Sequence, residues 1–242
     1  MLAPYLAWLR RGSPGTFVEL GALDGIDSSN TLLLERCLGW SGVLIEANPA
    51  NFAKLRASAR RSAKVHSAVC TPSLAMARSA DGTSSVRMTA RGGAEAEVVE
   101  PGVGSIRKLV DVPCRTLTSI MAEAGRPTAD LLSLDVEGSE DAVLRTVDPL
   151  AFRMILVEFN AGFRAFRNRS LQAEAVRREE WVEQRLLRAG LTRCQKPRIF
   201  WSRLYARAAE CPSALQHNAT LEQSLAIIDT FSAEHLLLKT IV

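Results

Sequence analysis

A short apolar run near the start of the chain leads into a turn that contains two glycines. The segment reads Thr16-Phe-Val-Glu-Leu-Gly-Ala-Leu-Asp-Gly25, and polar residues 27–30 follow where a helix would begin. Gly21 and Gly25 let the backbone approach a bound molecule, because neither has a side chain that would block it. A buried strand, a glycine turn and a helix start are the usual cradle for a nucleotide-like ligand.

Acidic residues follow the later apolar runs of the sequence. Glu46 lies at the end of the run 42–47. Asp135 ends a second run, and Glu158 lies near the end of a third. Parallel strands place their carboxyl ends at one edge of a sheet, which is where ligands bind. Because the Glu46 carboxylate can accept hydrogen bonds from both hydroxyls of a ribose, this pattern predicts a nucleoside site in acidic surroundings.

Each of these residues also has a structural interpretation. The glycines could simply end a strand, and Glu46 could be a surface carboxylate. Asp135 and Glu137 could cap a helix that is predicted to begin at Ser139, since acidic side chains favour helix N-termini. Glu158 lies within an apolar run, where a buried charge needs a partner.

Strand-like and helix-like segments alternate along the chain. Predicted strands cover residues 17–22, 42–47, 63–70, 130–135 and 153–160, with a final antiparallel pair at 191–195 and 199–204. Predicted helices cover residues 28–38, 48–60, 117–124, 139–147 and 174–189. This alternation predicts an α/β fold, in which a doubly wound parallel sheet has helices on both faces.

The 242 residues are predicted to form a single domain. Its expected parts are an N-terminal helix (1–15), a cofactor-binding half (16–70), an inserted hairpin or flap (71–111), the second half of the sheet (112–205) and a C-terminal helical tail (206–242). The insert is rich in Gly, Ser and Thr. Loops of this length inside compact domains are often functional.

Composition limits the classes of function. The net charge is +4, but no lysine-rich run or RNA-binding aromatic motif accompanies it, so no nucleic-acid partner is expected. Five scattered cysteines without a CxxC pair predict reduced core thiols. No apolar run is long enough to span a bilayer and no signal peptide is recognised, so a cytoplasmic location is expected.

Two cofactors fit an acidic ribose-binding residue. A nicotinamide dinucleotide requires a Gly-x-Gly-x-x-Gly turn for its pyrophosphate, and the turn after Leu20 lacks that triple. S-adenosylmethionine has no phosphate, and its positive sulfonium and ammonium groups suit acidic surroundings. The sequence therefore favours S-adenosylmethionine, with a dinucleotide oxidoreductase and a catalytically silent, partner-binding domain as alternatives.

Several segments resemble, in the expected order, the FkbM family of S-adenosylmethionine-dependent methyltransferases. They are Glu19-Leu-Gly-Ala-Leu-Asp-Gly25, Ser29-Asn-Thr31, Leu38-Gly-Trp-Ser-Gly42, Ile45-Glu-Ala-Asn-Pro49 and Asp130-Leu-Leu-Ser-Leu-Asp-Val-Glu-Gly138. The resemblance implies a class I methyltransferase (Rossmann-like) fold, whose mostly parallel seven-stranded sheet has an antiparallel last strand. It also implies O-methylation of a hydroxyl on a small molecule such as a sugar, a glycan or a secondary metabolite.

The resemblance further implies which residues contact the cofactor. These are Glu19, Gly21, Gly25, Ser29, Asn30, Thr31, Glu46, Ala68, Val69 and Asp135. Of these, residues 29–31 would lie beside the methionine end, and residues 68–69 would flank the adenine. Asp24 is predicted with them from its place on the glycine turn.

A hydroxyl acceptor must lose its proton as it attacks an electrophilic methyl group, so a base or a metal ion is needed beside it. We expect Asp135, Glu137 and Glu158 to lie near that hydroxyl and one of them to act as the base. Alternatively, Asp135 and Glu158, with Asn160 as a further oxygen ligand, would hold a divalent metal such as Mg²⁺.

Overall fold

The computed structural model describes residues 14–71, 77–78, 84–89, 98–99, 109–159, 169–194 and 202–211. Most of the predicted N-terminal helix, much of the insert, Asn160 and most of the predicted helical tail lie outside these ranges. The described strands and helices alternate along the main sheet as the sequence predicts.

The strands of the main sheet are β1 (Thr16–Leu20), β2 (Ser41–Glu46), β3 (Ala63–His66), β9 (Ala129–Leu134), β10 (Phe152–Glu158), β11 (Thr192–Arg193) and β12 (Ser202–Ala206). The helices are α2 (Leu32–Leu38), α3 (Pro49–Ala57), α4 (Leu117–Glu123), α5 (Glu140–Leu144) and α7 (Arg169–Arg188), with the short 3₁₀ helices η2 (Pro149–Ala151) and η3 (Ala208–Glu210). Within the described ranges, none of the helices combines the length and the apolar character needed to cross a membrane.

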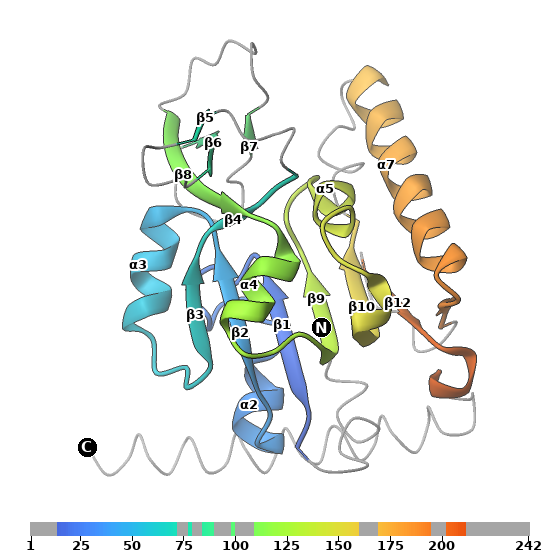
Figure 1. Ribbon diagram of the computed structural model, residues 1–242, viewed down its shortest axis with the longest axis horizontal. Coiled ribbons are helices and arrows are strands. Elements are labelled where there is room, and N and C mark those ends of the chain that lie inside the picture. The colour runs from blue at the N-terminus through green and yellow to red at the C-terminus, as the bar shows by residue number, and fades with distance from the viewer. Residues whose placement is uncertain are drawn as a thin grey trace.

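The seven strands form one sheet at the centre of the fold (Figure 1). Their order is β11-β12-β10-β9-β1-β2-β3. β1 pairs in parallel with both β2 and β9, and β10 pairs in parallel with β9. β12 runs antiparallel to its neighbours β10 and β11. The predicted mostly parallel sheet with an antiparallel last strand is therefore confirmed.

Side chains of the central strands alternate between two hydrophobic cores. Val18 and Leu20 of β1 pack with residues of α4, α5 and α7. Phe17, which points to the opposite face, packs with Leu34 of α2 and Leu55 of α3. Since successive side chains of a strand point to opposite faces, both faces of the sheet are covered by helices, as a parallel sheet requires.

The strand predicted over residues 63–70 is divided between two sheets. β3 pairs with β2, whereas β4 (Ala68–Val69) pairs with β8 (Leu109–Arg115) of a second, five-stranded sheet. This second sheet also contains β5 (Ala77–Arg78), β6 (Ser84–Thr89) and β7 (Val98–Val99), and it lies beyond the end of β3 (Figure 1). The division occurs at Ser67, whose hydroxyl donates to the Ala68 carbonyl oxygen at 2.7 Å.

Four of the five cysteines are paired, so the prediction of reduced core thiols is wrong. One disulfide joins Cys70 to Cys114 and ties β4 to β8. The other joins Cys194, which follows β11, to Cys211, which follows η3. Cys37 takes part in neither disulfide. The pairing has no signature in the sequence because the partners are 44 and 17 residues apart and only the tertiary fold brings them together.

Candidate functional site

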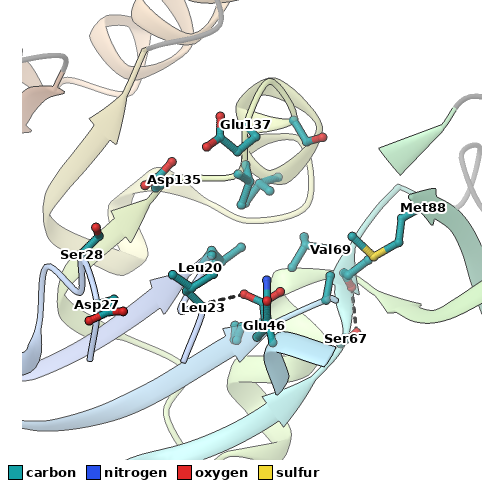
Figure 2. A pocket seen from close by; sticks show the side chains of 18 residues that line it. Leu20, Leu23, Asp27, Ser28, Glu46, Ser67, Val69, Met88, Asp135 and Glu137 are labelled. Atoms are coloured by element: carbon teal, nitrogen blue, oxygen red, sulfur yellow. Dashed lines mark hydrogen bonds between the residues drawn. The ribbon is translucent and has the colours of Figure 1, made fainter. Parts of the chain in front are cut away.

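A pocket opens where β1, β2 and β9 end (Figure 2). β1 lies between β2 and β9, and the chain crosses to opposite sides of it, which is the point where ligands bind in such sheets. The lining residues are Leu20, Gly21, Leu23, Asp27, Ser28, Ile45, Glu46, Ala47, Asn51, Ser67, Ala68, Val69, Met88, Asp135, Val136, Glu137, Ser139 and Val143. Of the predicted cofactor contacts, Gly21, Glu46, Ala68, Val69 and Asp135 are thus brought together here.

The floor of the pocket is a close backbone approach between the ends of β1 and β9. Gly21 has a φ of +76°, a conformation that favours glycine. A Cβ atom at Gly21 would overlap the carbonyl oxygen of Asp135. The Gly21 and Ala22 amides both donate to the Ile45 carbonyl oxygen, at 3.1 and 3.2 Å. The turn is therefore held against β2 and β9 at once, and only a glycine fits at position 21.

Glu46 is held at the end of β2 with its carboxylate oriented by the backbone. Its side chain is 6% exposed. One carboxylate oxygen accepts from the Leu23 amide at 2.9 Å, and the other accepts from the Asn48 amide at 2.8 Å. Burial raises the pKa of Glu46, against the effect of these two hydrogen bonds. The Asn51 side chain and the Ala47 backbone also hydrogen-bond this carboxylate. Because a carboxylate accepts hydrogen bonds on both oxygens, it is suited to two neighbouring hydroxyls of a ligand.

Acidic side chains cluster on the β9 side of the pocket. Burial, with the nearby carboxylates of Glu158, Glu137 and Glu140, raises the pKa of Asp135 to about 8. Glu137 adopts a φ of +57°, which is uncommon for a residue with a side chain. Asp135 and Glu137 line the pocket. Glu158 does not line it, but its charge raises the pKa of Asp135. A cationic ligand group would stabilise the ionised form of Asp135.

The opposite side of the pocket is mainly apolar, although Ser67 also lies there. Ala68 and Val69 of β4 lie there with Met88, which comes from β6 of the second sheet. In Figure 2, Glu46 lies between Asp135 on one side and Val69 and Met88 on the other. The pocket therefore changes from acidic to apolar across Glu46.

Six predicted cofactor contacts do not line the pocket: Glu19, Asp24, Gly25, Ser29, Asn30 and Thr31. Glu19 shares its face of β1 with Phe17, so its side chain points to the α2 and α3 side of the sheet. There it accepts from the Asn30 amide at 2.7 Å and from the Thr31 hydroxyl at 2.5 Å. A direct contact of these six residues with a ligand stays a prediction.

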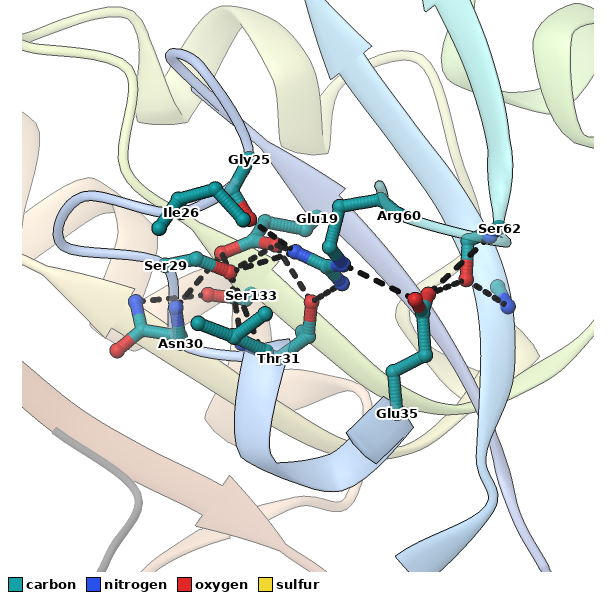
Figure 3. A network of polar contacts seen from close by, with 12 residues as sticks. Glu19, Gly25, Ile26, Ser29, Asn30, Thr31, Glu35, Arg60, Ser62 and Ser133 are labelled. Atoms are coloured by element: carbon teal, nitrogen blue, oxygen red, sulfur yellow. Dashed lines mark hydrogen bonds and ion pairs between the residues drawn. The ribbon is translucent and has the colours of Figure 1, made fainter. Parts of the chain in front are cut away.

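An internal ion-pair network centred on Arg60 contacts the glycine turn (Figure 3). The Arg60 guanidinium lies 3.8 Å from the Glu19 carboxylate and 3.3 Å from that of Glu35, and it is fully buried. It also donates to the Gly25 carbonyl oxygen at 2.7 Å. Burial raises the pKa of Glu19, and the Thr31 hydrogen bond and the Arg60 charge oppose that rise.

The same network shortens the first predicted helix. The Ser29 hydroxyl donates to Glu19 at 2.9 Å, and the Thr31 hydroxyl is committed to the same carboxylate. Helix α2 consequently begins at Leu32 instead of residue 28. Of the polar residues that resemble a helix start in the sequence, Ser29 and Asn30 are therefore hydrogen-bond partners of a buried glutamate.

Several lining residues were not predicted. Asn51 and Met88 are both buried, and Asn51 hydrogen-bonds the Glu46 side chain. A signal for Asn51 exists, because it lies one helical turn after Asn48, which caps α3 through its side chain. Asp27 and Ser28 also line the pocket, although the sequence pattern predicts a helix start there. No sequence signal places Met88, since the register of the insert against the main sheet is a tertiary property.

The described residues contain no group of three His, Cys, Asp or Glu side chains placed to hold a metal ion. Asp135 and Glu158 are described, but the third predicted ligand, Asn160, lies outside the described ranges. The described residues alone do not complete the predicted Mg²⁺ site, which stays a prediction.

Comparisons with known proteins add the following. A family model described as the methyltransferase FkbM domain matches residues 19–185. None of the curated proteins matches the sequence. Among solved structures, the chain is similar to the S-adenosylhomocysteine-bound methyltransferase PaMTH1 of Podospora anserina, with 9% identity and a TM-score of 0.45. That similarity covers 80% of this chain and 71% of the other.

Proposed function

The chain belongs to the FkbM family of methyltransferases, and we propose that it transfers a methyl group from S-adenosylmethionine to a hydroxyl group. The acceptor that we propose is a sugar, a glycan or another small secondary metabolite. The observation that carries the proposal is Glu46, a buried carboxylate in the pocket whose two oxygens are oriented by the Leu23 and Asn48 amides.

The residues of the pocket suit the parts of S-adenosylmethionine in order. Glu46 would accept hydrogen bonds from the two ribose hydroxyls. The apolar side at Ala68 and Val69 suits the adenine base, and the acidic side at Asp135 and Glu137 suits the sulfonium and ammonium groups. The absence of a side chain at Gly21 leaves the turn open for close approach of the ligand.

Bound S-adenosylmethionine supplies a methyl group on a positive sulfur, which a nucleophile displaces in line. The protein must align the acceptor hydroxyl and remove its proton. We propose Asp135 as the base, because it lines the pocket and the positive sulfonium of the bound cofactor would keep its carboxylate ionised. Glu137 also lines the pocket, whereas Glu158 would act by raising the pKa of Asp135.

Calorimetric titration with S-adenosylhomocysteine tests the cofactor site. We expect the wild-type protein to bind and Glu46→Ala to weaken binding at least about tenfold, because hydrogen bonds to a charged group are lost. Asp130→Ala is the control: Asp130 accepts a backbone hydrogen bond from Thr16 at 2.8 Å, but it lies at the start of β9, away from the strand ends, and does not line the pocket. An equal loss of affinity in both variants would contradict a direct contact between Glu46 and the ligand.

Two further measurements separate the alternatives. Absence of S-adenosylhomocysteine binding by folded wild-type protein, with binding of a nicotinamide dinucleotide, would favour an oxidoreductase. Binding without turnover on any hydroxylated acceptor would favour a silent domain. Incubation with isotopically labelled S-adenosylmethionine and a panel of sugars, glycans and phenols, followed by mass spectrometry, identifies the acceptor and the methylated atom.

A further inference from the structure

The second sheet contributes a side chain to the pocket through β6. Met88 lines the pocket and is 3% exposed. The neighbouring same-face residue of β6, Val86, is 1% exposed but does not line the pocket. Among its described residues, the predicted insert thus reaches the site at Met88.

The place of Met88 is set by the pairing of the second sheet. Met88 lies opposite Val110 of β8 in an antiparallel ladder that runs from Ser84 to Thr89. β8 in turn pairs with β4, and the disulfide between Cys70 and Cys114 joins those two strands. β4 provides Ala68 and Val69. Met88 therefore lines the same side of the pocket as β4, and strand pairing through β8 fixes its position relative to these two residues.

We propose that Met88 packs against the adenine base of the bound cofactor and that the second sheet is therefore part of the cofactor site. This inference rests on the proposed function. A ribose held by Glu46 has its base on one side and its sulfur-bearing arm on the other. The cationic arm matches the side of Asp135 and Glu137, which leaves the flat, apolar-faced base to the side of Val69 and Met88 (Figure 2).

A methionine suits this position chemically. Its thioether is polarizable and makes favourable contacts with aromatic rings, and its unbranched chain adapts to the ring it covers. The Met88 thioether donates no hydrogen bond to the edge of the base. It therefore contributes packing against the ring, while recognition of the ribose stays with Glu46.

The direct test is an NMR titration of protein labelled with ¹³C at the methionine methyl groups. The chain has five methionines, and Met88→Leu assigns the Met88 resonance. Because a ring current shifts nearby protons, the Met88 methyl signal should move on addition of S-adenosylhomocysteine and of 5′-methylthioadenosine, which lacks the amino-acid part. The signal of Met154, which is equally buried at 3% but packs in another core, should stay in place.

Calorimetry provides the energetic test. Met88→Ala should lower the affinity for both ligands by a similar factor of about ten. Met88→Leu conserves volume, so its affinities should stay within about threefold of wild type. Val86→Ala is the matched control for loosening of the second sheet and should leave both affinities within about twofold of wild type.

The outcomes separate this inference from the proposed function. If wild-type protein fails to bind S-adenosylhomocysteine, the proposed function fails and the inference falls with it. If wild-type protein binds but the Met88 methyl signal stays in place, the inference alone is overturned. Equal weakening by Val86→Ala and Met88→Ala, without a shift of that signal, would likewise assign Met88 to the packing of the sheet only.

Discussion

The Cα atom of Gly21 faces the backbone carbonyl oxygen of Asp135 so closely that a methyl group on Gly21 would overlap that oxygen. Gly21 begins the turn after β1 and Asp135 follows β9, so this contact joins the two neighbouring strand ends beneath the pocket. The glycine is therefore required both by its positive φ and by the backbone it meets.

Gly21→Ala should consequently destabilise the protein by at least about 3 kcal/mol and abolish cofactor binding, because the overlap involves backbone that cannot move aside cheaply. Gly125→Ala is the control: Gly125 has a similar φ of +66° but nothing within 4 Å of an added Cβ. That variant should lose only about 1 kcal/mol. Urea unfolding measures the stability of both variants. Equal losses would show that the positive φ alone requires glycine at position 21.

The affinity for S-adenosylmethionine should rise with pH between about 6 and 8. The pKa of Asp135 is raised to about 8, so at lower pH the folded protein holds a proton there, which a neighbouring sulfonium must displace. S-adenosylhomocysteine has a neutral sulfur and should show a weaker dependence. Calorimetry at several pH values measures the difference.

Asp135→Asn should bring the two pH dependences together, because its side chain has no proton to release. The control is Asp111→Asn, which changes an exposed aspartate of β8 that forms an ion pair with Arg87 of β6. That variant should leave the two pH dependences apart. Identical pH dependence for both ligands in the wild type would contradict the placement of the sulfonium beside Asp135.

Arg60→Met should cost about 3–5 kcal/mol of unfolding free energy, because it leaves two buried glutamates, Glu19 and Glu35, without their cation. Arg56→Met, at an exposed position on α3, should cost less than about 0.5 kcal/mol. Denaturant unfolding checks both. A small loss for Arg60→Met, in the presence of Glu19 and Glu35, would mean that those carboxyl groups are protonated in the folded state.

The disulfides should be detectable by counting thiols. Alkylation of unfolded, unreduced protein should modify one of the five cysteines, Cys37, and alkylation after reduction should modify all five. Replacing both Cys194 and Cys211 by serine should cost about 3 kcal/mol, as expected for a link that closes a loop of this length. Cys37→Ser is the control. Modification of all five without reductant would contradict the pairing.

Much of the main sheet could be predicted because its signals are local. Apolar runs of about five to seven residues, such as the one ending at Glu46, indicate buried parallel strands wherever glycine or polar residues bound them. The ends of parallel strands meet at one edge, so the sequence alone is enough to predict Glu46 and Asp135 in one pocket. Which face of a strand a side chain occupies is also a local property. The alternation along β1 could therefore have placed Glu19 on the face of Phe17, away from Val18 and Leu20.

The second sheet and the disulfides were not predictable in the same way. The division of residues 63–70 between two sheets depends on the pairing of β4 with β8, whose cysteines are 44 residues apart in the chain. The network that joins Glu19, Ser29 and Thr31 to Arg60 was not predicted either. It arises because a buried arginine just beyond the end of α3 needs acceptors, and the turn supplies them, while contact of these residues with the cofactor stays a prediction.

The sequence by itself determined the alternating α/β fold, the glycine turn after β1 and the acidic strand ends, since each depends on neighbouring residues and on the period of a strand or helix. Only the tertiary structure decided which of those groups share the pocket. The raised pKa of Asp135, the internal role of Glu19 and the contact of Met88 with the site all depend on side chains that are distant in sequence. Burial and proximity of such groups arise from packing, and packing has no local signature.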